Sequence, residues 1–248
     1  DAQDLHHTKV QTKIHIGKNL TRGLGAGMNP DIGRQAAEEN RDEIADALKG
    51  ADLVFITCGL GGGTGSGASP IIADAAHDVG ALAIAVVTKP FAFEGKKRAA
   101  IAEEALVALR DRVDTLITIP NDKVLNLIDK NTSIVEAFNI IDDILKQGVQ
   151  GIADLITYPG IVNVDFADIK VIMSSAGSAL MGIGRAIGED RAAVAAKAAI
   201  NSPLLDISIN GARGILFNVS GGMDLGMNDI NEAAKVITES IDSEAKVI

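Results

Sequence analysis

Short apolar runs alternate with longer amphipathic stretches along most of the chain. The run at residues 53–57 has no polar alternation, which is typical of a strand buried on both faces of a sheet. Other runs of similar length indicate further strands. The pattern as a whole predicts strands at residues 13–16, 53–58, 82–88, 115–119, 171–173, 179–183 and 214–219.

The stretches between these runs carry helix-end signals. Asn29 followed by Pro30 is an N-cap and first-turn signature, and Gly50 ends the helix that this pair begins. Ser133 and Glu136 form a capping box, which begins a long helix over about residues 133–156. Two more helices are predicted, one ending near residue 79 and one over residues 99–112.

The alternation of strands and helices predicts an α/β fold with a doubly wound, mostly parallel sheet. The first domain is expected to span residues 1–157 and to include the long connecting helix, and a smaller α/β domain is expected over residues 158–248. The chain begins without the strand and phosphate loop that usually open a doubly wound domain, and its last residues read as a strand just beginning. Both ends are therefore expected to be truncated.

Composition and charge narrow the classes of function. The net charge of −10 argues against a nucleic-acid-binding protein, because counterion release needs a basic face and the densest basic cluster, residues 96–98, is short. The single cysteine, Cys58, excludes an internal disulfide and fits a reducing compartment. No apolar stretch approaches the roughly 20 residues that cross a bilayer. We therefore expect a cytoplasmic protein without direct membrane insertion.

The clearest signal for chemistry is the segment GLGGGTGSG at residues 59–67, which follows a predicted strand and has six glycines in nine residues. Glycine reaches backbone conformations closed to other residues, so successive N–H groups can converge on an anion. The following helix adds the positive end of its dipole, and Thr64 and Ser66 add hydroxyl groups. The segment predicts a phosphate-binding loop, against the plainer interpretation of a flexible turn. It matches neither the Walker loop nor the dinucleotide fingerprint.

Residues 61–67, GGGTGSG, resemble the signature of the tubulin/FtsZ family, and nearly the whole chain is similar to its FtsZ branch. The other segments that carry the resemblance are residues 21–30, 87–95, 119–122, 163–168, 178–184, 201–205 and 220–222. The resemblance implies a tubulin/FtsZ-like fold, GTP binding and hydrolysis, and head-to-tail polymerisation at the division site. It also implies that the chain lacks the family's first strand and phosphate loop, its last strands and its C-terminal tail, through which other division proteins would bind.

The resemblance also implies where GTP or GDP binds. The loop before Asn29 is expected to face the terminal phosphate. The loop that follows the predicted strand at residues 82–88 is expected to face the ribose. Phe138 is expected to stack on guanine, and Asp142, four residues later on the same helix face, to accept hydrogen bonds from its edge. From the residues alone, a core Phe and a solvated Asp are the simpler interpretation. The nucleotide-binding residues implied are Ala26, Gly27, Met28, Gly61, Gly62, Gly63, Thr64, Gly65, Ser66, Gly67, Pro90, Glu94, Arg98, Asn121, Phe138 and Asp142.

An acidic motif, Asn163, Asp165 and Asp168, begins the second predicted domain. Its carboxylates are three residues apart and face one side of a helical turn, where they could position a water molecule for attack on a phosphate. From the residues alone, an Asp165 that caps a short helix is the simpler interpretation. The resemblance implies instead that this loop acts on the nucleotide of the neighbouring subunit. Mg²⁺ is expected to bridge the phosphates, with its protein ligands unknown.

Two other functions stay open at this stage. One is a dinucleotide-dependent oxidoreductase on a similar sheet, against which the failed dinucleotide fingerprint counts. The other is a nucleotide-binding filament protein that assembles without hydrolysing its nucleotide.

Overall fold

A computed structural model describes residues 2–125, 128, 131–158, 160, 164–202, 204–205, 209, 211–242 and 244–248. Its contacts divide the chain into two compact units, one of residues 1–122 with 173–179 and one of residues 123–172 with 180–248. The long helix belongs to the second unit, whereas the sequence analysis counts it with the first domain. The functional boundary at residue 157 stays a prediction.

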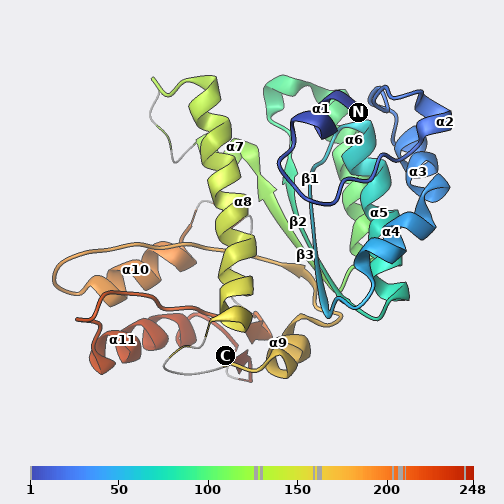
Figure 1. Cartoon of the computed structure of the whole chain (residues 1–248). Helices are drawn as coiled ribbons and strands as arrows, with labels where there is room; N and C mark the ends of the chain where they lie inside the picture. Colours follow the sequence, from blue (N-terminus) through green and yellow to red (C-terminus); the bar gives the residue numbers. More distant parts are fainter. Residues whose placement is uncertain are drawn as a thin grey trace. The chain divides into compact units, whose positions relative to one another are not determined.

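The first unit contains a parallel sheet with the strand order β1-β2-β3-β4 (Figure 1). Its strands are β1 (Leu53–Gly59), β2 (Leu82–Lys89), β3 (Thr115–Pro120) and β4 (Gly177–Ala179). In register, Gly59 lies opposite Thr88, and Lys89 lies opposite Pro120. The first three strands therefore end at one edge of the sheet, which we call the carboxyl edge. The α/β fold with a parallel sheet is confirmed.

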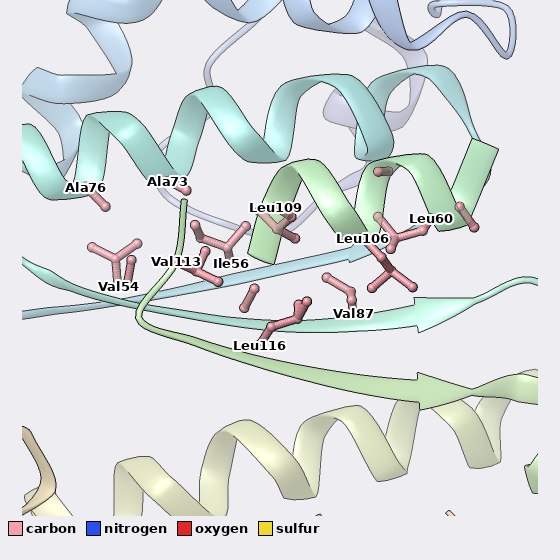
Figure 2. Close-up of a cluster of buried hydrophobic side chains, with 14 of the residues drawn as sticks. Val54, Ile56, Leu60, Ala73, Ala76, Val87, Leu106, Leu109, Val113 and Leu116 are labelled. Atoms are coloured by element: carbon pink, nitrogen blue, oxygen red, sulfur yellow. The ribbon is translucent and has the colours of Figure 1, made fainter. Parts of the chain in front are cut away.

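Residues 2–124 also form helices, and some of these are very short. They are α1 (Ala2–His7), α2 (Lys18–Thr21), α3 (Pro30–Glu39), α4 (Arg41–Leu48), α5 (Gly63–Asp78), the 3₁₀ turn η1 (Ala92–Glu94), α6 (Lys96–Arg110) and α7 (Asn121–Val124). Figure 2 shows that α5 and α6 cover the same face of β1, β2 and β3.

The core between these layers is aliphatic. The labelled side chains in Figure 2 include Val54 and Ile56 of β1, Leu106 and Leu109 of α6, and Val87 of β2. Residues 82–87 of β2 are all buried, on both faces of the strand, which explains why this part of the chain has no polar alternation. Burial of a Leu, Val or Ile side chain contributes about 1.5–3 kcal/mol.

Several element predictions were wrong. Residues 13–16 form no strand; Ile14 and Ile16 pack against the cluster that includes Ala37 and Ile44. Residues 171–173 end a helix. The strand expected at 179–183 lies instead at residues 177–179, as β4, and the one expected at 214–219 is reduced to the two residues of β5. These runs are too short for hydrophobic periodicity to distinguish strand from helix.

The helix predicted from Pro30 to about residue 49 is two helices, α3 and α4, separated at Asn40. The Asn40 side chain is used elsewhere, because its Oδ1 accepts a hydrogen bond from the Gly17 N–H at 2.9 Å. A tertiary hydrogen bond thus accompanies the break in a helix that local sequence signals would continue.

The second unit contains α8 (Ile134–Thr157), α9 (Phe166–Met173), α10 (Arg191–Ile200), α11 (Met227–Thr238) and the two-stranded parallel sheet of β5 (Gly214–Ile215) and β6 (Lys246–Val247). The predicted N-cap of α8 is confirmed, because the Ser133 hydroxyl accepts a hydrogen bond from the Glu136 N–H at 3.2 Å. Helices α10 and α11 pack through Ala192, Ala196, Ala233 and Ile237.

An ion cluster ties these two helices to the loop before α11. The Arg191 guanidinium binds the carboxylates of Asp224 and Asp229, and hydrogen bonding to Arg191 lowers the pKa of both carboxyl groups. Among the described residues, no helix is long and apolar enough to cross a membrane.

Candidate functional site

The glycine run of residues 59–67 connects the end of β1 to the start of α5. Gly61 has a φ of +98°, which residues with a Cβ rarely adopt, and its N–H donates to the Ser66 Oγ at 2.9 Å. Ser66 is buried, so its hydroxyl holds the turn together from inside. The turn is also anchored to β2, because the Leu60 N–H donates to the Thr88 carbonyl.

Close backbone contacts fix the start of α5 against α3. A Cβ on Gly63 would lie 2.7 Å from the Ala26 Cβ, and a Cβ on Gly67 would lie 2.6 Å from the Arg34 nitrogen. Gly33 of α3 faces Gly63 in the same way. These contacts place the loop before Asn29 beside the glycine run. Gly33 was not predicted to belong to the site. A glycine inside a predicted helix often indicates close packing, and this signal could have identified Gly33.

The first turn of α5 leaves its N–H groups available. Within the part of the chain that the structure describes, no acceptor is found for the N–H groups of Gly62, Gly63, Thr64 and Gly65. Gly62 is the N-cap, has no side chain to cap the helix, and a Cβ there would meet nothing within 4 Å. Thr64 is exposed beside it. A helix start of this kind attracts an anion through its N–H groups and its dipole.

The loop of Ala26, Gly27 and Met28 makes the neighbouring wall. Gly27 and Met28 have φ values of +57° and +62°, and the Asn29 N–H donates to the Ala26 carbonyl at 3.0 Å. Asn29 is the predicted N-cap of α3, since its Oδ1 accepts from the Asp31 N–H at 3.0 Å. A left-handed conformation at the non-glycine Met28 is uncommon and is found mainly at constrained positions.

The loop after β2 lies against the glycine run. A Cβ on Gly61 would be 3.3 Å from the Pro90 Cγ and 2.9 Å from the Arg98 carbonyl oxygen. Glu94 accepts a hydrogen bond from the Phe91 N–H at 2.9 Å and forms an ion pair with Arg98. The carboxylate therefore organises this loop, and any further contact with a ribose stays a prediction.

Asn121 follows β3 at the same carboxyl edge. The residue is buried, with 5% of its surface exposed, and its Oδ1 has no hydrogen-bond partner among the residues that the structure describes. The next residue joins the two loops, because the Asp122 carboxylate accepts from the Ala92 N–H at 3.0 Å. A buried acceptor without a donor is costly in a folded protein, and it fits a site that a ligand completes.

The remaining predicted site residues belong to the second unit. Phe138 and Asp142 lie on the exposed side of α8, next to the stripe of buried residues that includes Ala137 and Ile141. Because the structure describes the two units separately, the approach of these side chains to the glycine run stays a prediction.

The acidic motif lies at the start of α9. The Asp165 Oδ1 accepts from the Ala167 N–H, and the Asp168 Oδ2 accepts from the Asp165 N–H, both at 3.3 Å. The capping interpretation is thus correct for Asp165, and both aspartates are also exposed. Asn163 lies outside the described residues.

Cys58 lies under the glycine run, with its Sγ 3.6 Å from the Gly65 carbonyl oxygen. Burial raises the pKa of this thiol to about 11. Because only the thiolate reacts, we expect alkylation by iodoacetamide at pH 8 to be about a hundredfold slower in the native protein than in urea. The rate should rise about tenfold for each pH unit up to the pKa. Equal rates in both states, measured by mass spectrometry, would contradict this burial.

Comparison with known proteins agrees with this geometry. Residues 1–129 match the GTPase domain of the tubulin/FtsZ family, and residues 177–248 match the C-terminal domain of the FtsZ family. The fold is similar to a solved structure of M. jannaschii FtsZ, an empty dimer, with 47% identity and a TM-score of 0.95 over 100% of this chain and 72% of that one. A point mutant of M. jannaschii FtsZ gives 48% identity and a TM-score of 0.95, over 100% of this chain and 74% of that one.

A more distant likeness extends the fold comparison. GDP-bound CetZ1 of Haloferax volcanii has 22% identity and a TM-score of 0.81, over 100% of this chain and 77% of that one. The resemblance found in the sequence is confirmed by the family domains and by the identity to FtsZ. The chain belongs to the tubulin/FtsZ family of GTPases, in its FtsZ branch.

Proposed function

We propose that this chain binds GTP at the carboxyl edge of its four-stranded sheet and hydrolyses it within head-to-tail filaments of the division ring. The observation that carries the proposal is the first turn of α5, where consecutive N–H groups have no acceptor among the described residues and a Cβ on Gly62 would meet nothing within 4 Å. The dipole of α5 and the N–H groups of its first turn together favour the binding of a phosphate at this position. Membership in a family of GTPases supports a guanine nucleotide.

The ribose and base would lie beyond the phosphates, over the loops after β2 and β3. The unpaired Asn121 Oδ1 needs a donor, which a ribose hydroxyl or a base amino group can supply. Phe138 offers an exposed ring for stacking, with 42% of its surface accessible. The Asp142 carboxylate would accept from the guanine N–H and amino group. Adenine presents an acceptor at that edge, so a carboxylate there selects guanine.

A magnesium ion would accompany the phosphates. Magnesium keeps several waters and binds through phosphate oxygens in many nucleotide sites. The described residues contain no group of three or more His, Cys, Asp or Glu side chains placed to hold a metal. A Mg²⁺ held by phosphate and water does not require such a group, and it would neutralise charge that develops on the transferred phosphoryl group.

Hydrolysis would be completed by a neighbouring copy. Asp165 and Asp168 are exposed at the start of α9, where a second molecule can reach them. Their carboxylates, with the amide of Asn163, would orient the attacking water toward the terminal phosphate. A contact between one copy's acidic motif and another's glycine run is heterologous, so it extends into an open filament. The dimer described for M. jannaschii FtsZ supports self-association.

The test is GTP turnover measured against protein concentration. A site shared between subunits should lose specific activity steeply below a threshold concentration, because dissociated monomers lack the acidic motif in trans. Constant specific activity at high dilution would show that one copy is sufficient. Assembly with GTP but without phosphate release would favour a filament protein that does not hydrolyse GTP, and binding of a nicotinamide dinucleotide would favour an oxidoreductase.

The cellular setting is also proposed from the family. The chain would act in the cytoplasm at the division site. Other division proteins would bind a C-terminal tail in the manner that the resemblance implies.

A further inference from the structure

The N-terminal part of the chain carries a net positive charge, whereas the whole chain carries a net negative charge. Residues 5–30 contain no aspartate or glutamate, although the chain carries a net charge of −10. The stretch carries four cations, all at exposed residues: Lys9, Lys13, Lys18 and Arg22. Among the described residues, no carboxylate lies within 4.0 Å of their charged groups. This basic segment therefore forms no ion pair with the residues that the structure describes.

An acidic segment follows it directly on the surface of the first unit. It contains four exposed carboxylates at the end of α3 and on α4: Glu39, Asp42, Glu43 and Asp46. None of these carboxylates forms an ion pair with a described residue. Nearby arginines are already paired, Arg34 with Glu38 and Arg41 with Asp78.

The two segments are held side by side. The Asn19 side-chain amide donates to the Glu39 carboxylate at 2.5 Å, and the Gly17 N–H donates to the Asn40 Oδ1 at 2.9 Å. Ile14 and Ile16 pack against the same cluster as Ile44. The basic segment, along α2 and the residues before it, and the acidic segment, from the end of α3 along α4, are therefore two adjacent halves of one surface of the first unit. Figure 1 shows α2, α3 and α4 next to one another.

A face with adjacent halves of opposite charge is complementary to itself. When two copies meet about a two-fold axis, the basic half of each lies on the acidic half of the other, which is an isologous contact. We propose that this face, four cations beside four carboxylates, pairs two copies of the chain side by side. Such an isologous contact differs in symmetry from the heterologous head-to-tail contact, and none of its eight charged residues belongs to the proposed nucleotide site.

The proposed contact is electrostatic and exposed, so salt should control it. Exposed ion pairs are individually weak and are screened at high ionic strength. The Debye length falls from about 30 Å at 0.01 M salt to about 3 Å at 1 M. Pairing is therefore expected at low salt, without nucleotide, and should be lost at high salt.

The experiment is sedimentation velocity of the whole chain without nucleotide, at about 10 mM and about 1 M salt. Wild type should double its mass at low salt only. Lys18→Glu/Arg22→Glu makes the face largely acidic, and Asp42→Lys/Asp46→Lys makes it largely basic; each variant alone should stay monomeric. An equimolar mixture of the two should form a heterodimer at low salt. Thermal unfolding of each variant checks that the fold is retained.

A matched control keeps the change in net charge but moves it elsewhere. Lys197→Glu/Lys235→Glu alters two exposed helical residues of the second unit and should dimerise like wild type. A wild type that stays monomeric at low salt, or reversed variants that do not combine, would overturn the proposal. Binding of the basic segment to vesicles of an anionic phospholipid, without the heterodimer, would assign it to a lipid surface instead.

Discussion

Asp165→Asn is expected to reduce GTP turnover by at least about a hundredfold while leaving the fold intact. Asparagine retains the oxygen that accepts from the Ala167 N–H and is a good helix cap, so α9 should still begin at the same residue. The substitution removes the negative charge that would orient and deprotonate the attacking water, and loss of such a group typically costs 10²–10⁴ in rate. Steady-state phosphate release is the measurement, with nucleotide affinity determined separately.

Two further variants separate chemistry from folding. Asp165→Ala removes the cap as well as the charge, so it should lower the thermal stability of the second unit in addition to the turnover. Asp168→Asn keeps the acceptor for the Asp165 N–H and should behave like Asp165→Asn. Wild-type turnover in both asparagine variants, at a concentration where filaments form, would remove the acidic motif from the mechanism.

Gly62→Asp is expected to weaken GTP binding by at least about a hundredfold without lowering the stability of the fold. The N-cap has φ −94° and ψ 176°, which any residue adopts, and the new side chain would enter open space. An aspartate there can accept from the free N–H groups of α5 and interacts favourably with the helix dipole, so the free energy of unfolding should be unchanged or rise by about 1 kcal/mol. The same carboxylate occupies the groups proposed for phosphate and repels its charge.

Gly62→Ser is the matched control, because it caps the same N–H groups without a charge. It should stabilise the fold like Gly62→Asp and weaken GTP binding far less. Isothermal titration calorimetry with GTP and urea unfolding of each variant give the two quantities. Wild-type affinity in Gly62→Asp would show that α5 does not hold the phosphates.

A mixture of Gly62→Asp and Asp165→Asn also tests whether the catalytic site is shared between subunits. Gly62→Asp retains the acidic motif, and Asp165→Asn retains the nucleotide site. Mixing two nearly inactive proteins should therefore recover turnover, at junctions where the acidic motif of the first meets the nucleotide of the second. Failure to recover any activity, with co-assembly demonstrated by sedimentation, would place both functions within one copy.

The sequence by itself determined the central strands and the glycine-rich turn that follows the first of them. The apolar runs at residues 53–58, 82–88 and 115–119 leave the backbone few alternatives to a strand. Burial on both faces is found for β2, but the same prediction for residues 53–57 was wrong, because β1 alternates buried with partly exposed residues and its Thr57 is exposed. The glycines of residues 59–67 and the caps at Asn29 and Ser133 are equally local signals, because each acts on backbone groups within a few residues. The resemblance to the FtsZ branch followed from these same motifs.

Only the tertiary structure decided how the local pieces are used. It broke the helix after Pro30 at Asn40, whose side chain accepts from Gly17, and it turned the Ser66 hydroxyl inward to Gly61. It brought the loops after β1, β2 and β3 to one edge, where the buried Asn121 Oδ1 has no donor within the described part of the chain. These outcomes depend on atoms far apart in the chain, whereas hydrophobic periodicity and capping report only on neighbours within a few residues.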